Sequence, residues 1–133
     1  MGKMSRNKGS SFERKIANEL KRWFPNAKRG IGQTRSSSEV PDVDGTPFWI
    51  ECKHRKSISI VGAFEQATRA LARATQQRGI GQIPWEVPLV VSRVDGGPIL
   101  VTMSAEAFAN MLEVVYPPKP PAADDEVSPE SVG

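Results

Sequence analysis

Residues 40–56 read VPDVDGTPFWIECKHRK, and this stretch predicts a β-hairpin. A short apolar run leads to the dipeptide Asp44-Gly45, which favours the tight turn between two antiparallel strands. Residues 48–53 follow as an alternating segment. One predicted strand therefore carries Asp42, and the other carries Glu51 and Lys53.

The two faces of the second predicted strand differ in chemistry, because successive side chains of a strand point to opposite faces. One face joins the core and carries Phe48, Ile50 and Cys52. The other face places Glu51 beside Lys53, within reach of Asp42. Two carboxylates and an ammonium group fit a metal-dependent phosphodiesterase, since Mg²⁺ takes oxygen ligands and the attacking water needs a base or positioning group. The sequence therefore predicts an enzyme that cuts nucleic acid.

The Pro41-Asp42 pair and the Glu51-x-Lys53 spacing resemble the PD-(D/E)XK nuclease superfamily. The flanking residues are similar to its small Holliday-junction resolvase-like branch from archaea, bacteria and phages. Residues 9–14, GSSFER, resemble the first helix of that family with its acidic residue, and Gln66 lies in a later helix where related enzymes often carry Gln. The resemblance covers residues 8–103 and implies a restriction-endonuclease-like core.

The same resemblance implies roles for particular residues. Asp42, Glu51 and the main-chain carbonyl of Cys52 would bind Mg²⁺, with Mn²⁺ as a substitute, and Lys53 would position or polarise the attacking water. The implied catalytic set is Glu13, Asp42, Glu51, Lys53 and Gln66.

Several of these residues also have a purely structural interpretation. Glu13 stands three residues after Ser10, so the pair equally fits a capping box at the start of a helix. Lys53 begins a basic run, and Gln66 fits a solvated helix surface. Asp44 most simply serves the turn. The sequence leaves these alternatives open.

The remaining pattern predicts an α/β domain with a central mixed sheet and helices on its faces. Apolar side chains recur at helical spacing over residues 10–24, with Phe12, Ile16, Leu20 and Trp23 on one stripe. Further elements are expected as helices over residues 60–78 and 104–116 and as strands over residues 88–94 and 99–103. Ser104 is the expected cap of the last helix.

The chain divides into three parts by composition. Residues 1–8 are expected to form a flexible basic arm and residues 9–116 a nuclease domain. Residues 117–133 are rich in proline and acidic side chains, which predicts a disordered tail. No apolar run is long enough to span a membrane, and no signal peptide is evident, so we expect a location in bacterial, archaeal or phage-infected host cytoplasm.

Charge is distributed unevenly along the 133 residues. Residues 1–35 carry ten Lys or Arg against two Glu, whereas residues 121–133 carry four acidic residues and no basic one. A basic body attracts a polyanion, and phosphate contacts give salt-sensitive binding with little sequence dependence. The expected partner is therefore DNA. The candidate DNA-binding residues are Lys3, Arg6, Lys8, Arg29, Arg35, Arg55 and Lys56.

These observations predict a Mg²⁺-dependent endodeoxyribonuclease, and the resemblance favours a Holliday-junction resolvase acting in recombination and repair. A symmetric four-way junction needs two matched incisions, which a homodimer supplies. The alternatives are a general DNA endonuclease, nickase or exonuclease of the same fold in repair or phage genome processing, and a non-catalytic DNA-binding protein. The complete Asp42, Glu51 and Lys53 set argues against the last alternative.

Overall fold

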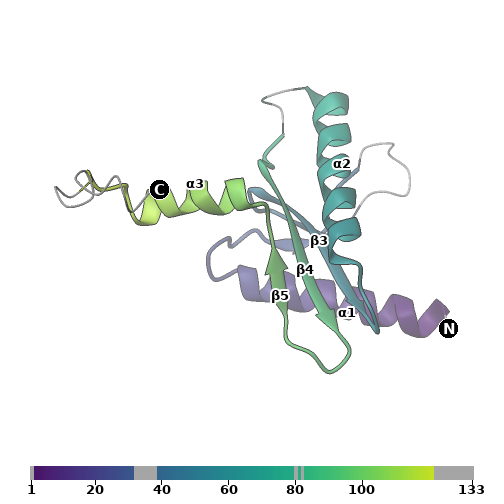
Figure 1. Ribbon diagram of the computed structural model, residues 1–133. Coiled ribbons are helices and arrows are strands. Elements are labelled where there is room, and N and C mark those ends of the chain that lie inside the picture. Colours follow the sequence, from purple (N-terminus) through teal and green to yellow (C-terminus); the bar gives the residue numbers. More distant parts are fainter. Residues whose placement is uncertain (1, 32–38, 80, 82, 122–133) are drawn as a thin grey trace.

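The computed structural model describes residues 2–31, 39–79, 81 and 83–121, with only the backbone described for residues 2–6. In this part of the chain, three helices and five strands form one α/β arrangement (Figure 1). The elements are α1 (Gly2–Leu20), β1 (Lys28–Arg29), β2 (Val43–Asp44), β3 (Phe48–Arg55), α2 (Ile60–Arg78), β4 (Val87–Val94), β5 (Leu100–Thr102) and α3 (Ala105–Val115).

The five strands form one mixed sheet in the order β1-β2-β3-β4-β5. β3 and β4 run parallel, while the other neighbouring pairs are antiparallel. A parallel pair needs a crossover connection, and α2 supplies it between β3 and β4. The mixed α/β sheet predicted from the sequence is confirmed.

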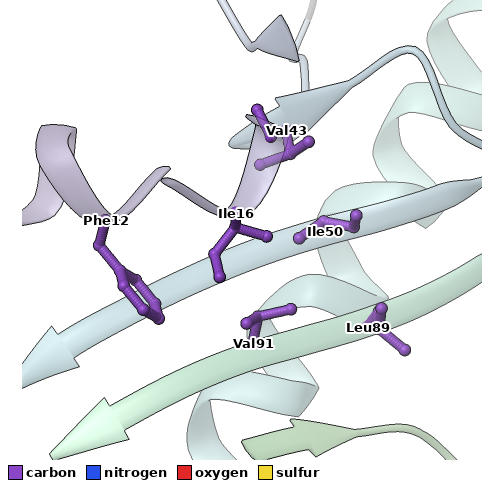
Figure 2. Packing of buried hydrophobic residues seen from close by; sticks show 7 residues of the cluster. Phe12, Ile16, Val43, Ile50, Leu89 and Val91 are labelled. Carbon is purple, nitrogen blue, oxygen red and sulfur yellow. The ribbon is translucent and has the colours of Figure 1, made fainter. Parts of the chain in front are cut away.

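Helices cover both faces of the sheet. On one face, Phe12 and Ile16 of α1 pack against Val43, Ile50 and Val91 (Figure 2). On the other face, the small side chains of α2 pack against the strands and two indole rings. The buried members of this second cluster are Trp49, Ala63, Ala67, Ala70, Ala74, Trp85 and Val90. The predicted alternation along β3 is therefore confirmed, since Ile50 faces α1 and Trp49 faces α2.

The predicted hairpin turn also forms as expected. Gly45 has a φ of 86°, which is in the left-handed region where glycine carries no steric penalty. The Asp44 carboxylate accepts a hydrogen bond from the Gly45 N–H at 2.8 Å and another from the Trp85 indole at 3.1 Å. These contacts support the structural role of Asp44.

The first helix differs from its prediction at both ends. It begins at Gly2 instead of residue 10. The backbone of residues 2–8, expected as an arm, therefore continues α1. The helix ends at Leu20, and Trp23 is 63% exposed in the following turn, so its predicted place in the core stripe is wrong.

The other helices lie where the sequence placed them. α2 has the predicted bounds, and the Ser104 side chain caps α3 by accepting a hydrogen bond from the Ala107 N–H. None of the described helices combines the length and the apolar composition that a membrane crossing requires. The expected tail lies outside the described residues from residue 122 onward.

Candidate active site

The site begins where β2 stops pairing with β3. These strands pair in register at Val43 and Ile50, and the Asp42 N–H then donates to the Ile50 carbonyl at 2.8 Å. Two residues further along β3, the Cys52 N–H donates a hydrogen bond to the Asp42 carboxylate at 2.8 Å. The Asp42 side chain thus occupies the position that a longer partner strand would fill, and its orientation is fixed by the backbone.

The same edge of β3 also presents a main-chain oxygen. The N–H and C=O of one strand residue point to the same edge, and this direction repeats every second residue. Ile50 directs its carbonyl toward Asp42, so the carbonyl of Cys52 points to the same edge. The geometry therefore supports the expected ligand role of the Cys52 carbonyl.

Glu51 and Lys53 lie on the face of β3 that α2 covers. The Trp49 indole N–H donates to Glu51 Oε2 at 3.0 Å, which holds the carboxylate in place. Lys53 lies near both carboxyl groups, and its positive charge partly opposes the rise in pKa that burial causes in Asp42 and Glu51. The structure brings together the three residues on which the nuclease prediction rests.

The two carboxyl groups are strongly perturbed. The pKa of Asp42 is raised from 3.8 to about 7, chiefly by burial and then by the neighbouring Glu51 charge. The Cys52 N–H and Lys53 oppose the rise, and Glu13 adds to it. Burial also raises the pKa of Glu51, against the hydrogen bond from Trp49 and the charge of Lys53. Two half-buried carboxyls whose pKa values are both raised are suited to bind a cation, which favours their charged form.

Burial likewise raises the pKa of the Cys52 thiol, so the thiol stays protonated. The side chain packs at the margin of the core cluster beneath α1. Only the main chain of Cys52 is placed to take part in the site.

An open pocket of about 1060 Å³ surrounds these residues. It is lined by Asp42, Glu51, Cys52 and Lys53, and also by Glu13 from α1 and Gln66 from α2. The five residues of the predicted catalytic set therefore line one pocket.

Glu13 has a partner that the sequence did not reveal. The Arg29 Nε–H donates to Glu13 Oε1 at 2.7 Å, in a partly buried ion pair. Ser10 lies inside α1 and not at its start, so the capping-box interpretation of Glu13 is wrong. Glu13 lines the pocket, and its carboxylate pairs with Arg29.

The candidate DNA-binding residues have different surroundings. Arg55 and Lys56 are exposed at the pocket, while Lys8 lines it and pairs with Asp95 at 2.8 Å. The side chains of Lys3 and Arg6, and the whole of Arg35, lie outside the described residues. A basic rim is therefore present around the pocket at Lys8, Arg55 and Lys56.

Sequence reasoning missed the ion pair between Glu39 and Arg73, both of which line the pocket. The Arg73 guanidinium donates to both oxygens of Glu39, with Nη2 3.1 Å from Oε2. Arg78 adds a hydrogen bond to the Glu39 carbonyl at 3.2 Å. No local signal joins residues so far apart in sequence.

The donor set can be tested against particular metal ions. Within the described ranges, no group of three or more His, Cys, Asp or Glu side chains is arranged to hold a metal ion. Structural zinc normally requires four such ligands. Mg²⁺ is commonly held by one or two carboxylates, with water and substrate phosphate completing its shell. The Asp42 and Glu51 carboxylates and the Cys52 carbonyl fit this second pattern.

The formal charges that line the pocket are balanced. The basic residues are Lys8, Lys53, Arg55, Lys56 and Arg73, and the acidic residues are Glu13, Glu39, Asp42, Glu51 and Asp95. Without a cation, the two central carboxylates repel a phosphate group. A divalent cation bound by these carboxylates would add positive charge that favours phosphate.

A mixed sheet covered by helices, with two carboxylates and a lysine at the end of its central hairpin, defines a nuclease core of the PD-(D/E)XK type. A family model described as "Phage putative PDDEXK endonuclease" matches residues 4–120, and the chain belongs to this family. The match includes every residue of the predicted catalytic set. Nucleases of this superfamily are generally dependent on divalent metals. Searches of curated proteins and of solved structures gave no significant match.

Proposed function

We propose that this nuclease is a Mg²⁺-dependent endodeoxyribonuclease that resolves four-way DNA junctions. Metal-dependent phosphodiester cleavage is supported by one observation. The half-buried carboxyl groups of Asp42 and Glu51 lie beside Lys53 in an open pocket. Its setting would be bacterial, archaeal or phage-infected host cytoplasm.

In the proposed mechanism, Asp42, Glu51 and the Cys52 carbonyl would hold the cation. Bound Mg²⁺ would polarise the scissile phosphate and supply an activated water. The Cys52 N–H and the Trp49 indole keep the Asp42 and Glu51 carboxyl groups oriented for this role.

Lys53 contributes from the same face of β3 as Glu51. Its ammonium group positions the attacking water and offsets the negative charge that develops on the phosphate. Gln66 lines both this pocket and a smaller adjoining one, which Lys53 also lines. Gln66 is therefore placed to orient water or phosphate oxygen next to Lys53. Glu13, held by Arg29, adds negative charge that favours the cation.

The basic residues around the pocket bind the DNA backbone. Lys8, Arg55 and Lys56 surround the site of chemistry, and Arg73 becomes available if phosphate replaces Glu39 as its partner. Contacts with phosphate groups position the duplex but do not distinguish one base sequence from another. Discrimination between substrates must therefore come from the shape of the DNA.

A branched substrate suits such a surface, because its arms present phosphate groups in several directions. The choice of a four-way junction rests on the resemblance to junction resolvases. Opposed nicks in a two-fold symmetric junction also suit a homodimer.

The test is a comparison of substrates in Mg²⁺. A labelled four-way junction, a linear duplex of matched sequence, a flap and a single strand are incubated with the protein. The proposal expects paired nicks in opposed strands of the junction and slow cleavage of the duplex. Cleavage of linear duplex at the same rate as the junction would reject the resolvase proposal in favour of a general DNA endonuclease.

A further inference from the structure

An apolar surface extends from the edge of the sheet along α3. We name it the β5–α3 surface. Its exposed residues are Leu100, Val101, Phe108, Met111, Leu112, Val114, Val115 and Tyr116, with exposed fractions from 39% to 82%. Figure 1 shows α3 running outward from the end of β5, on the side of the sheet away from the start of α1.

This helix lacks the packing that normally stabilises a short helix. α3 has 11 residues, none of them buried against the described part of the chain. Isolated helices shorter than about 12–15 residues are marginal in water. Large apolar side chains that are exposed together on one element typically mark an interaction site. α3 therefore needs a partner that covers its apolar side chains.

Two possible occupants fit poorly. The charged residues of α3 are Glu106 and Glu113, so the surface does not attract the DNA that the basic rim would bind. The segment 122–133 has four acidic residues, and its largest apolar side chains are two valines. This segment has the same negative charge as α3 and few apolar side chains, so it is a poor partner for eight large apolar side chains.

A second copy of the chain fits well, because the surface can complement itself. On α3, Phe108, Met111, Leu112 and Val115 follow the spacing i, i+3, i+4, i+7, which forms one stripe for packing against another helix. β5 is the last strand in the sheet order, so its outer edge can pair with β5 of a second copy about a two-fold axis.

The extent of the surface also matches a dimer. Each partner in a standard interface buries about 800 Å². Eight large apolar side chains with the exposed fractions given above supply an area of that order. We propose that the β5–α3 surface is a two-fold interface with a second copy of this chain.

The proposed interface leaves the nuclease pocket open. No residue of β5 or α3 is among those that line the pocket. Two copies joined at this surface would therefore both keep access to DNA. The inference names a surface for the dimer proposed above, but it is argued from different residues and is tested without DNA or metal.

The experiment measures the mass of the full-length protein by sedimentation equilibrium over a wide range of concentration. Val115→Glu places a charge within the proposed interface, and Met111→Glu does the same at its centre. Val61→Glu is the matched control, because Val61 on α2 is 71% exposed and Val115 is 64% exposed. Thermal unfolding of each variant checks that the sheet and its two covering helices remain folded.

We expect the wild type and Val61→Glu to have about twice the mass of 14.6 kDa. Val115→Glu and Met111→Glu should sediment as monomers. A wild type that stays monomeric at every concentration overturns the proposal. It is equally overturned if both α3 variants remain dimers, or if Val61→Glu dissociates as they do. A missing nuclease activity would leave these measurements unaffected.

Discussion

The substitution Asp42→Asn should stabilise the metal-free protein at neutral and alkaline pH, although it removes a proposed catalytic group. Asn keeps an oxygen that can accept the hydrogen bond from the Cys52 N–H. It also removes a negative charge that is half-buried next to Glu51. Active-site residues often lower the stability of the folded protein in this way.

The pH dependence follows from the direction of the pKa change. The folded protein keeps Asp42 protonated up to about pH 7, whereas its ordinary pKa is 3.8. The stabilisation from this proton is complete below about pH 4 and is lost as the pH rises to about 7. At about 1.4 kcal/mol for each pKa unit, the loss is at most about 4 kcal/mol. The side chain of Asn is neutral at every pH, so the variant does not lose this stability as the pH rises.

The assay is thermal or urea unfolding in chelator at a series of pH values. Asp42→Asn should match the wild type near pH 4 and exceed it near pH 8, by a melting-temperature difference on the order of 10 °C. Added Mg²⁺ should raise the stability of the wild type at pH 8 and have little effect on the variant. Glu65→Gln, on the exposed surface of α2, is the control and should follow the wild type. If Asp42→Asn is no more stable than the wild type at pH 8, the reasoning about Asp42 is refuted.

Three further outcomes are expected. Lys53→Ala should lose far more of the single-turnover cleavage rate than Arg55→Ala or Lys56→Ala, and equal losses would make Lys53 only part of a phosphate-binding run. Arg55→Ala and Lys56→Ala should each lower the slope of log binding constant against log salt concentration by roughly 0.9, and an unchanged slope would remove that residue from the DNA interface. The cleavage rate at limiting Mg²⁺ should rise with pH up to about 7, because Asp42 must lose its proton to bind the cation; a rate independent of pH in this range would contradict the ligand role.

The sequence predicted those parts of the fold that depend on local interactions. The hairpin between β2 and β3 follows from a turn dipeptide and from alternation along one strand, and α2 follows from helical spacing. The spacing did not show which residues of α2 lie deepest, and these are Ala63, Ala67, Ala70 and Ala74. Small side chains allow the helix to approach Trp49 closely, which depends on the tertiary fit.

The sequence could not predict contacts between distant segments. β1 has two residues and forms because Lys28 and Arg29 meet β2. This pairing also brings Arg29 to Glu13, a contact that charge patterns along the chain do not reveal. The start of α1 was missed because the helix continues for two turns beyond its apolar stripe, into a segment with two glycines and no apolar periodicity.

The candidate site was predictable because its central residues lie on one hairpin. Asp42 and Glu51 are adjacent across the strand pair, and Lys53 is two positions from Glu51. The surroundings of the site come from other elements. Glu39 and Arg73 meet only after α2 has folded onto the sheet, so their place at the pocket was not available from the spacing of residues.

The central claim is that the Asp42 and Glu51 pair holds a divalent cation that drives phosphodiester cleavage. Its most direct test is the single-turnover cleavage of a labelled four-way junction by wild type, Glu51→Gln and Glu65→Gln, each with Mg²⁺ and with chelator. The account predicts cleavage by the wild type and Glu65→Gln in Mg²⁺ only, with Glu51→Gln inactive in both conditions while it still binds the junction. Cleavage by Glu51→Gln at the wild-type rate, or full activity of the wild type in chelator, would contradict it.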